Sequence, residues 1–311
     1  MIRPCHSRGA LKESLTIWML GDGKPGHENQ SLGLIDAIGR IVPCSVHRIS
    51  LAGSRGLFTR VGTAVATSAG FPKPDLIVSA GHSTHLSLLW LARKHDASSI
   101  VLMRPSLPMG WFDLCIIPEH DLPDGSSRSN VILTRGALNR VALPEKTARG
   151  GKMLLIGGPS ASHGWDGEQL VSALAEISTH GTWQLTDSRR TPEGFLKEVR
   201  ERLPAIEIFP HTETSPDWLP QKLAAADEVW VTEDSVSMIY EALSSGGRVG
   251  LLPMPVTRPD SRVLKGIGML VAGKFLTTFA GWRTSRQLDS PPSVLREADR
   301  CARRVVSYLS S

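Results

Sequence analysis

Short apolar runs alternate with amphipathic segments of helix length along the chain. Six apolar runs of the first half are bounded by turn residues and predict strands at 15–20, 45–51, 75–81, 98–104, 113–119 and 130–138. Apolar residues at helical spacing predict the helices between them, at 29–40, 56–69 and 83–94. Strands separated by helices indicate βαβ units and a parallel sheet.

The same alternation restarts after the polar segment 140–152, which contains Pro and Gly and which we interpret as a linker. The strands predicted beyond it are 152–158, 182–188, 206–211, 228–235 and 248–254. The helices predicted beyond it are 167–180, 192–203, 219–226, 235–245 and 291–309. A chain of 311 residues exceeds the size at which one core keeps growing. The pattern therefore predicts an α/β fold of two Rossmann-like, parallel-sheet domains that face a central cleft.

The predicted organisation has three parts. Residues 1–145 form an N-terminal domain, and residues 146–290 form a C-terminal domain. The remaining segment, 291–311, is a helix that we expect to pack back towards the N-terminal domain. Its apolar face is formed by residues at helical spacing, namely Val294, Ala298, Cys301, Ala302, Val305 and Leu309.

Charge and cysteine content narrow the class of protein. The chain has 35 Lys and Arg against 30 Asp and Glu, a net charge of +5, without a dense basic block. This favours an acidic small molecule or an anionic membrane surface as partner over a nucleic acid. Cys5, Cys44, Cys115 and Cys301 show no C-x-x-C spacing, so neither zinc nor a disulfide framework is indicated. The first fifteen residues lack a signal-peptide pattern, and no apolar run reaches the ~18 residues of a membrane span. We expect a cytoplasmic protein, soluble or peripheral on the inner membrane face.

The stretch LGDGKPGHENQSLGL, at 20–34, joins the first predicted strand to the first predicted helix. A helix N-terminus after a glycine-rich turn presents free N–H groups and a positive dipole end to an anion. Lys24 adds positive charge, and His27 titrates near neutrality and can remove a proton. The alternative is a tight turn in which Asn29 or Ser31 caps the helix. The sequence lacks the H-E-x-x-H spacing here, so we expect no metal site.

Two further motifs follow strands of the second half. IGGPS, at 156–160, offers Gly157, Gly158 and Ser160 to phosphate oxygens. Such glycines are also common in α/β proteins that bind no phosphate.

In the motif DSRRTP, at 187–192, Ser188 precedes two adjacent arginines. Arg189 and Arg190 can clamp a diphosphate because guanidinium groups match phosphate geometry. Pro192 suits the first position of the following helix. The alternative is a solvated basic turn.

The fourth motif, EDSVSMIYEA at 233–242, predicts a helix start after a strand. Ser235 and Ser237 lie in its first turn, where hydroxyls and free N–H groups can hold phosphate. Glu241 shares a face with Asp234 and Ser237, and a carboxylate there can accept two hydrogen bonds from a ribose. The alternative is an N-capped amphipathic helix with an exposed Glu241.

Together, DGKPGHENQS, IGGPS, SRRTP and EDSVSMIYEA resemble the Elongated Mitochondria family, over about residues 15–255. The resemblance implies the two-domain GT-B glycosyltransferase architecture. The fourth motif is similar to the donor-site helix of the lipid-linked N-acetylglucosaminyltransferase of peptidoglycan synthesis. This implies that Ser235 and Ser237 hold a diphosphate and that Glu241 holds a ribose. That enzyme's glycine-rich first loop implies a base at His27, flanked by Gly23 and Gly26.

We therefore hypothesise a metal-independent glycosyltransferase that moves a sugar from a nucleotide-activated donor to an acceptor hydroxyl, for which a cell-envelope or lipid-linked molecule is a candidate. The catalytic residues are His27 and Lys24. The residues expected to bind the donor are Gly157, Gly158, Ser160, Ser188, Arg189, Arg190, Asp234, Ser235, Ser237 and Glu241. The residues of the acceptor-side loop are Gly23, Gly26, Glu28, Asn29 and Gln30. No cofactor is expected beyond the nucleotide sugar as co-substrate.

Two other functions are compatible with the same motifs. One is a non-catalytic GT-B-like scaffold that recruits partners, as the name of the family implies. The other is a binder or hydrolase of nucleotide sugars, which would cleave the donor without an acceptor.

The segment 51–73 mixes Leu57, Phe58 and Phe71 with arginines and a lysine, a composition suited to the surface of an anionic membrane. Ordinary core packing with a basic rim is the interpretation that we favour for it. A Phe58→Asp variant would separate the two, because a core residue would unfold the protein and a surface residue would only weaken membrane binding.

Overall fold

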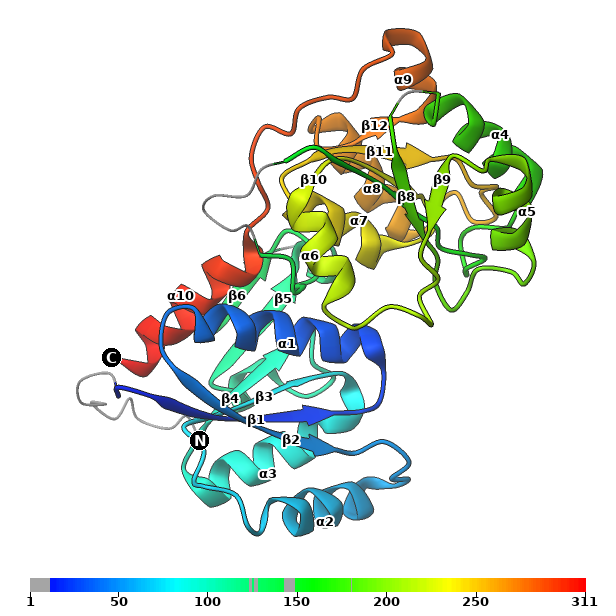
Figure 1. Cartoon of the computed structure of the whole chain (residues 1–311). Coiled ribbons are helices and arrows are strands. Elements are labelled where there is room, and N and C mark those ends of the chain that lie inside the picture. The colour runs from blue at the N-terminus through cyan, green and yellow to red at the C-terminus, as the bar shows by residue number, and fades with distance from the viewer. Residues whose placement is uncertain (1–11, 123–124, 126–127, 143–148, 180) are drawn as a thin grey trace. The chain divides into compact units, whose positions relative to one another are not determined.

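The computed structural model describes residues 12–122, 125, 128–142, 149–179 and 181–311 (Figure 1). Cys5, most of the first fifteen residues and segment 143–148 of the predicted linker lie outside the described residues. The chain divides into two compact units. Unit 1 ends at Arg140 and also includes Arg296–Ser311, and unit 2 is Val141–Leu295.

Unit 1 is built on six parallel strands in the order β2-β1-β3-β4-β5-β6. These strands are β1 (Leu15–Gly21), β2 (Cys44–Ser50), β3 (Leu76–Ala80), β4 (Ser98–Leu102), β5 (Leu114–Pro118) and β6 (Val131–Thr134). Its helices are α1 (Pro25–Gly39), α2 (Leu57–Ser68), α3 (His85–His95) and α10 (Glu297–Leu309). Its short 3-10 turns are η1 (His82–Thr84), η2 (Met109–Trp111) and η3 (Glu119–Asp121). All six strands predicted for this half are confirmed.

Helices cover both faces of this sheet, although the edge strand β2 stays largely exposed. Helices α1 and α10 cover one face, and α2 and α3 cover the other (Figure 1). Successive side chains of a strand point to opposite faces. Accordingly, Ile17 and Met19 of β1 pack with α1 and α10, whereas Trp18 and Leu20 pack in the core on the α2 and α3 side. Burial on both faces explains why the predicted strands are almost continuously apolar.

Helix α10 packs against unit 1 through its predicted apolar stripe. Cys301, Ala302 and Val305 of this stripe are fully buried. The helix begins at Glu297 and not at 291. Pro292 disfavours a helical conformation at Pro291, so the helix does not begin at the predicted residue. Val294, predicted on the stripe, therefore lies outside the helix and beside Gly246 of unit 2.

Unit 2 also has six parallel strands, in the order β12-β11-β10-β7-β8-β9. They are β7 (Gly151–Leu155), β8 (Trp183–Thr186), β9 (Ile206–Ile208), β10 (Ala226–Thr232), β11 (Arg248–Leu252) and β12 (Thr277–Thr278). The helices are α4 (Gly167–Ile177), α5 (Phe195–Arg202), α6 (Trp218–Ala225), α7 (Val236–Ser244), α8 (Arg262–Ala272) and α9 (Phe279–Ser285). Helices α6, α7 and α8 pack on one face, and α4, α5 and α9 pack on the other. The strands predicted here are confirmed, and α8, α9 and β12 are additions to the prediction.

Each sheet has one point at which the strand order reverses. In unit 1 it lies between β1 and β3, and in unit 2 between β7 and β10. Ligands of open parallel sheets bind outside the carboxyl ends of the strands at this switch point. Three of the four motifs directly follow β1, β7 and β10.

None of the helices within the described residues has the length and apolarity that a membrane span requires.

Candidate functional site

At the switch point of unit 1, Asp22 and His27 form a pair at the carboxyl end of β1. His27 Nδ1 lies 3.0 Å from Asp22 Oδ2. The Ser83 hydroxyl, which follows β3, donates to the same oxygen at 3.2 Å, and the Lys24 backbone N–H donates to Oδ1 at 3.2 Å. The Asp22 side chain is 5% exposed and the His27 side chain 18% exposed. The carboxylate is therefore enclosed, while the imidazole remains partly accessible.

The surroundings of Asp22 keep it ionised. Burial raises the pKa of the Asp22 carboxyl, but hydrogen bonds from His27, Lys24 and Ser83 outweigh burial and hold the pKa below its ordinary value. A carboxylate accepts a hydrogen bond from Nδ1–H, so the lone pair of the neutral imidazole lies on Nε2. An imidazole oriented in this way can take a proton from a hydroxyl at Nε2.

Gly81, which follows β3, makes room for this pair. Its φ is +92°, a conformation that favours glycine. A Cβ at this position would lie 2.4 Å from His27 Nδ1 and 2.8 Å from Asp22 Oδ2. Gly81 is therefore required for the close approach of β1 and β3 loops around the pair.

The predicted start of the first helix is wrong. Helix α1 begins at Pro25 and not near Asn29, because proline has a preset φ and needs no N–H at the first helical position. Lys24 is the N-cap residue, and its exposed side chain does not cap the helix. Asn29 and Ser31 lie inside α1, so the alternative interpretation, in which one of them caps the helix, is also wrong.

The residues predicted for the acceptor side are spread over the loop and the first turns of α1. Gly23 is an exposed loop residue with φ +80°. The Glu28 side chain turns back towards β1, where its Oε1 lies 2.8 Å from the position of a Cβ on Gly21. Gly26 faces open space, and Asn29 and Gln30 are half-buried on α1.

At the switch point of unit 2, a buried Asp234 joins the loops that follow β7, β8 and β10. Its Oδ2 accepts a hydrogen bond from the Gly158 N–H at 3.1 Å and lies 2.6 Å from Arg190 Nη2. Arg190 Nη1 also donates to the Gly158 carbonyl at 2.9 Å. The Gly157 N–H donates to the Thr232 hydroxyl at 2.7 Å. The N–H groups expected to bind phosphate are thus bonded within the protein.

The two glycines of this motif are required by close packing. A Cβ on Gly157 would lie 2.4 Å from Asp234 Oδ2, and a Cβ on Gly158 would lie 2.0 Å from the Arg190 carbonyl oxygen. Glycine therefore allows the Asp234 carboxylate and the Arg190 backbone to reach the end of β7.

Arg189 and Arg190 lie in a turn and not at a helix N-terminus. Helix α5 begins at Phe195, after Gly194 with φ +86°, so the predicted helical start at Pro192 is wrong. The Ser188 hydroxyl accepts from the Arg190 N–H at 3.2 Å and so shapes the turn. The Arg189 side chain is exposed.

Ser160 shapes its own loop. Its hydroxyl accepts hydrogen bonds from the backbone N–H groups of Ser162 and His163, at 3.3 and 3.2 Å. His163 is buried, and burial lowers the pKa of its imidazole despite the nearby Asp234 carboxylate.

The first turn of α7 has one exposed hydroxyl, that of Ser237. Ser235 is the N-cap residue and is buried, and its side chain makes no capping hydrogen bond. Ser237 is exposed in the first turn, where backbone N–H groups have no partner within the helix. Glu241 is half-buried two turns further from Asp234.

Several residues of these clusters were not identified from the sequence. They are Asp22, Gly81, Ser83 and Thr232, together with Thr191, whose hydroxyl donates to the Gly157 carbonyl at 2.5 Å. The available signal was a carboxylate between two glycines directly after a strand, GDG at 21–23, and a glycine directly after β3. Within the part of the chain that the structure describes, no group of three or more His, Cys, Asp or Glu residues could hold a metal ion.

The fold is shared with solved structures at low sequence identity. An enzyme of Listeria monocytogenes described as a putative UDP-N-acetylglucosamine 2-epimerase is 12% identical, with a TM-score of 0.62 and 96% of each chain covered. The UDP-GlcNAc 2-epimerase of Methanocaldococcus jannaschii is 14% identical, with a TM-score of 0.56 over 94% of this chain and 99% of that one. MurG of Acinetobacter baumannii is 11% identical, with a TM-score of 0.53 over 95% and 99%. The fold is therefore GT-B-like, as expected.

The sequence comparisons identify the family. An uncharacterised protein of Rickettsia prowazekii is 25% identical over 222 residues, which cover 56% of this chain and 63% of that protein. The family described as Mitochondrial fission ELM1 matches residues 25–309. This match includes all four motifs apart from the first residues of the opening loop. The chain belongs to the mitochondrial fission ELM1 family.

Proposed function

We propose that this protein is a glycosyltransferase that uses a nucleotide-activated sugar and needs no metal. Two of the reported structural relatives are described as UDP-N-acetylglucosamine 2-epimerases, which supports a nucleotide sugar as the class of ligand. The observation that carries the proposal is the Asp22–His27 pair at the switch point of unit 1.

In the proposed reaction, the oxygen of an acceptor hydroxyl attacks the anomeric carbon of the donor sugar. The bond between that carbon and the diphosphate oxygen breaks, and its electron pair leaves with the nucleoside diphosphate. His27 Nε2 takes the proton of the hydroxyl, and Asp22 stabilises the imidazolium that results. Lys24, exposed at the N-cap of α1, supplies positive charge for an anionic acceptor or for the donor phosphate.

Unit 2 holds the donor in this proposal. The first turn of α7 offers the Ser235 and Ser237 hydroxyls and free N–H groups to the diphosphate. Arg189 supplies an exposed guanidinium, and Glu241 accepts hydrogen bonds from the ribose. We assign a positioning role to the remaining predicted donor residues, because Gly157, Gly158 and Arg190 are bonded to Thr232 and Asp234.

A non-catalytic scaffold is the second candidate. The same internal bonds favour it, because they occupy N–H groups and a guanidinium that a diphosphate would otherwise use. The name of the family also refers to mitochondrial fission and not to sugar transfer.

Ligand-induced thermal stabilisation separates the two candidates. A nucleoside diphosphate or its sugar at 100 times its dissociation constant should stabilise the protein by about 2.7 kcal/mol, which raises Tm by several degrees. Ser237→Asp should abolish this shift, since the added charge repels a diphosphate while an acid at a helix start keeps α7 folded. The neutral control Ser237→Asn should retain the shift. If no nucleotide or nucleotide sugar raises Tm, the scaffold is the correct function.

A further inference from the structure

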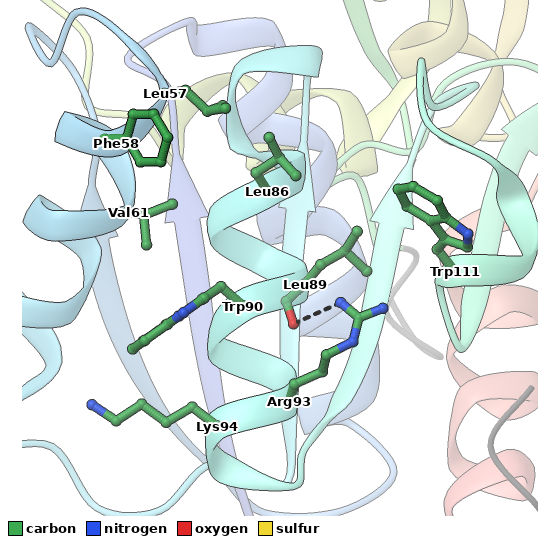
Figure 2. A pocket seen from close by; sticks show the side chains of 9 residues that line it. All are labelled: Leu57, Phe58, Val61, Leu86, Leu89, Trp90, Arg93, Lys94 and Trp111. Carbon is green, nitrogen blue, oxygen red and sulfur yellow. Dashed lines mark hydrogen bonds between the residues drawn. The ribbon is translucent and has the colours of Figure 1, made fainter. Parts of the chain in front are cut away.

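An apolar groove of about 800 Å³ lies on unit 1, on the outer side of α2 and α3 and next to η2. Figure 2 shows the nine side chains that line it, with Leu57, Phe58 and Val61 from α2, five residues from α3, and Trp111 from η2. None of the nine carries a hydroxyl, an amide or a carboxylate. The groove therefore offers apolar surface and N–H donors, and its lining side chains include no oxygen that could accept a hydrogen bond from a peptide N–H.

Aromatic side chains at this groove are unusually exposed. Phe58 is 89% exposed, and Leu57, Trp90 and Trp111 are also exposed. Clustered exposed apolar side chains on a soluble domain mark an interaction surface. The favoured interpretation of Phe58 as a core residue is therefore wrong. The interpretation as a core residue is correct for Phe71, which packs edge-on against Trp18 with ring centroids 5.8 Å apart.

The chain segment that supplies the lining of the groove has more basic than acidic residues. Between Leu51 and Phe112 the chain has two acidic residues, Asp75 and Asp96. Asp75 is bonded to Lys12 and to a backbone N–H of β1, and Asp96 lies beyond the C-terminus of α3. The same segment has six basic residues, which are Arg55, Arg60, Lys73, Arg93, Lys94 and Arg104.

Two of these cations lie in the groove itself. Arg93 donates to the Leu89 carbonyl at 3.3 Å, which holds its guanidinium along α3 (Figure 2). The Lys94 ammonium lies 5.0 Å from the centre of the Trp90 ring. Long cationic side chains over aromatic rings suit the boundary between lipid headgroups and acyl chains.

We propose that this groove docks unit 1 onto the surface of an anionic phospholipid membrane. Phe58, Leu57 and Trp111 enter the acyl boundary, and Arg93 and Lys94 contact lipid phosphates. Phe58 projects outwards and does not line a closed pocket, which fits insertion into lipid better than reception of a peptide. Membrane binding of this kind goes beyond the proposed transfer reaction and does not depend on it.

Co-sedimentation with vesicles tests the docking. The probes are vesicles of phosphatidylcholine alone and vesicles that also contain phosphatidylglycerol. The wild type should bind the anionic vesicles at least about tenfold more tightly, and the difference should shrink at high salt. Phe58→Ser should weaken binding about tenfold, and Lys94→Gln about fivefold. Both side chains are at the surface, so both variants should unfold at the same temperature as the wild type.

Met269→Ser is the matched control, because Met269 is 65% exposed on α8 of unit 2. It should bind the anionic vesicles like the wild type. Equal binding to neutral and anionic vesicles, or an equal loss in Met269→Ser and Phe58→Ser, would overturn the proposal. A wild type that stays in the supernatant with both kinds of vesicle would overturn it too.

Discussion

The two switch points place a carboxylate at the same kind of position but pair it with different groups. In unit 1, Asp22 contacts His27, whose neutral imidazole has a lone pair that can accept a proton. In unit 2, Asp234 contacts Arg190, whose guanidinium group has hydrogen-bond donors and no acceptor. The first pair can exchange a proton with a substrate. The second holds the loops after β7, β8 and β10 together.

A position at a switch point therefore does not by itself distinguish a reactive site from a structural contact. Both clusters follow glycine-rich loops, and both depend on glycines that admit a neighbouring group. At Gly81 that neighbour is a partly accessible imidazole, whereas at Gly158 it is the Arg190 backbone. The identity and accessibility of the neighbour decide what the loop can do.

The largest effect on stability should follow from adding a methyl group to the cluster of Asp234, Gly158 and Arg190 in unit 2, whose groups are bonded to one another. In Gly158→Ala the new Cβ would collide with the Arg190 carbonyl, so we expect a loss of about 3 kcal/mol. In Gly26→Ala, in the first turn of α1 next to His27, the Cβ meets no atom within 4 Å, and we expect a gain of about 0.5 kcal/mol. Urea unfolding of both variants measures the difference. If the two variants were equally stable, the tight packing at Gly158 and the free space at Gly26 would not explain their stabilities.

A smaller effect should appear in the pH dependence of the stability that the Asp22–His27 pair contributes. The pKa of Asp22 is lower in the folded than in the unfolded protein, so its contribution to stability is present above the ordinary pKa of about 3.9 and is lost as the pH falls through the folded pKa. Asp22→Asn should therefore lower the urea midpoint at pH 7, and this deficit should narrow below pH 4.

The matched control for Asp22→Asn is a variant that removes a carboxylate from an exposed salt bridge. Glu201→Gln removes a carboxylate that lies 3.8 Å from Lys197 on the surface of α5. An exposed pair of this kind contributes little, so its midpoint should follow the wild type at every pH. A deficit in Asp22→Asn that persists unchanged at low pH would contradict the assignment of a stabilised carboxylate.

Most of the fold could be predicted because apolar alternation is a local signal. The strands that the sequence predicted were found, as were the helices between them. Helix α8 escaped prediction because Gly266 and Gly268 weaken its helical character, although Val263, Ile267 and Leu270 keep helical spacing. Helix α9 is short, and β12 has only two residues.

Which residues meet around Asp22 and around Asp234 depends on the order of the strands in each sheet. The apolar pattern of the sequence does not predict that order. His27 could be singled out from its local motif, and its catalytic role stays a prediction. Gly81 and Ser83 reach Asp22 and His27 only because β3 is the neighbour of β1 in the sheet. Likewise, the bonds of Asp234 to Gly158 and Arg190 require β10 to lie beside β7.

Release of nucleoside diphosphate tests the central claim most directly, namely that His27 is the base of a sugar transfer. The assay uses the nucleotide sugar that gives the largest thermal shift, with a lipid extract of the cell envelope as acceptor. His27→Ala should keep the thermal shift and lose at least about 100-fold in turnover, since general-base catalysis contributes 10² to 10⁴. Turnover of His27→Ala within about threefold of the wild type would contradict the claim.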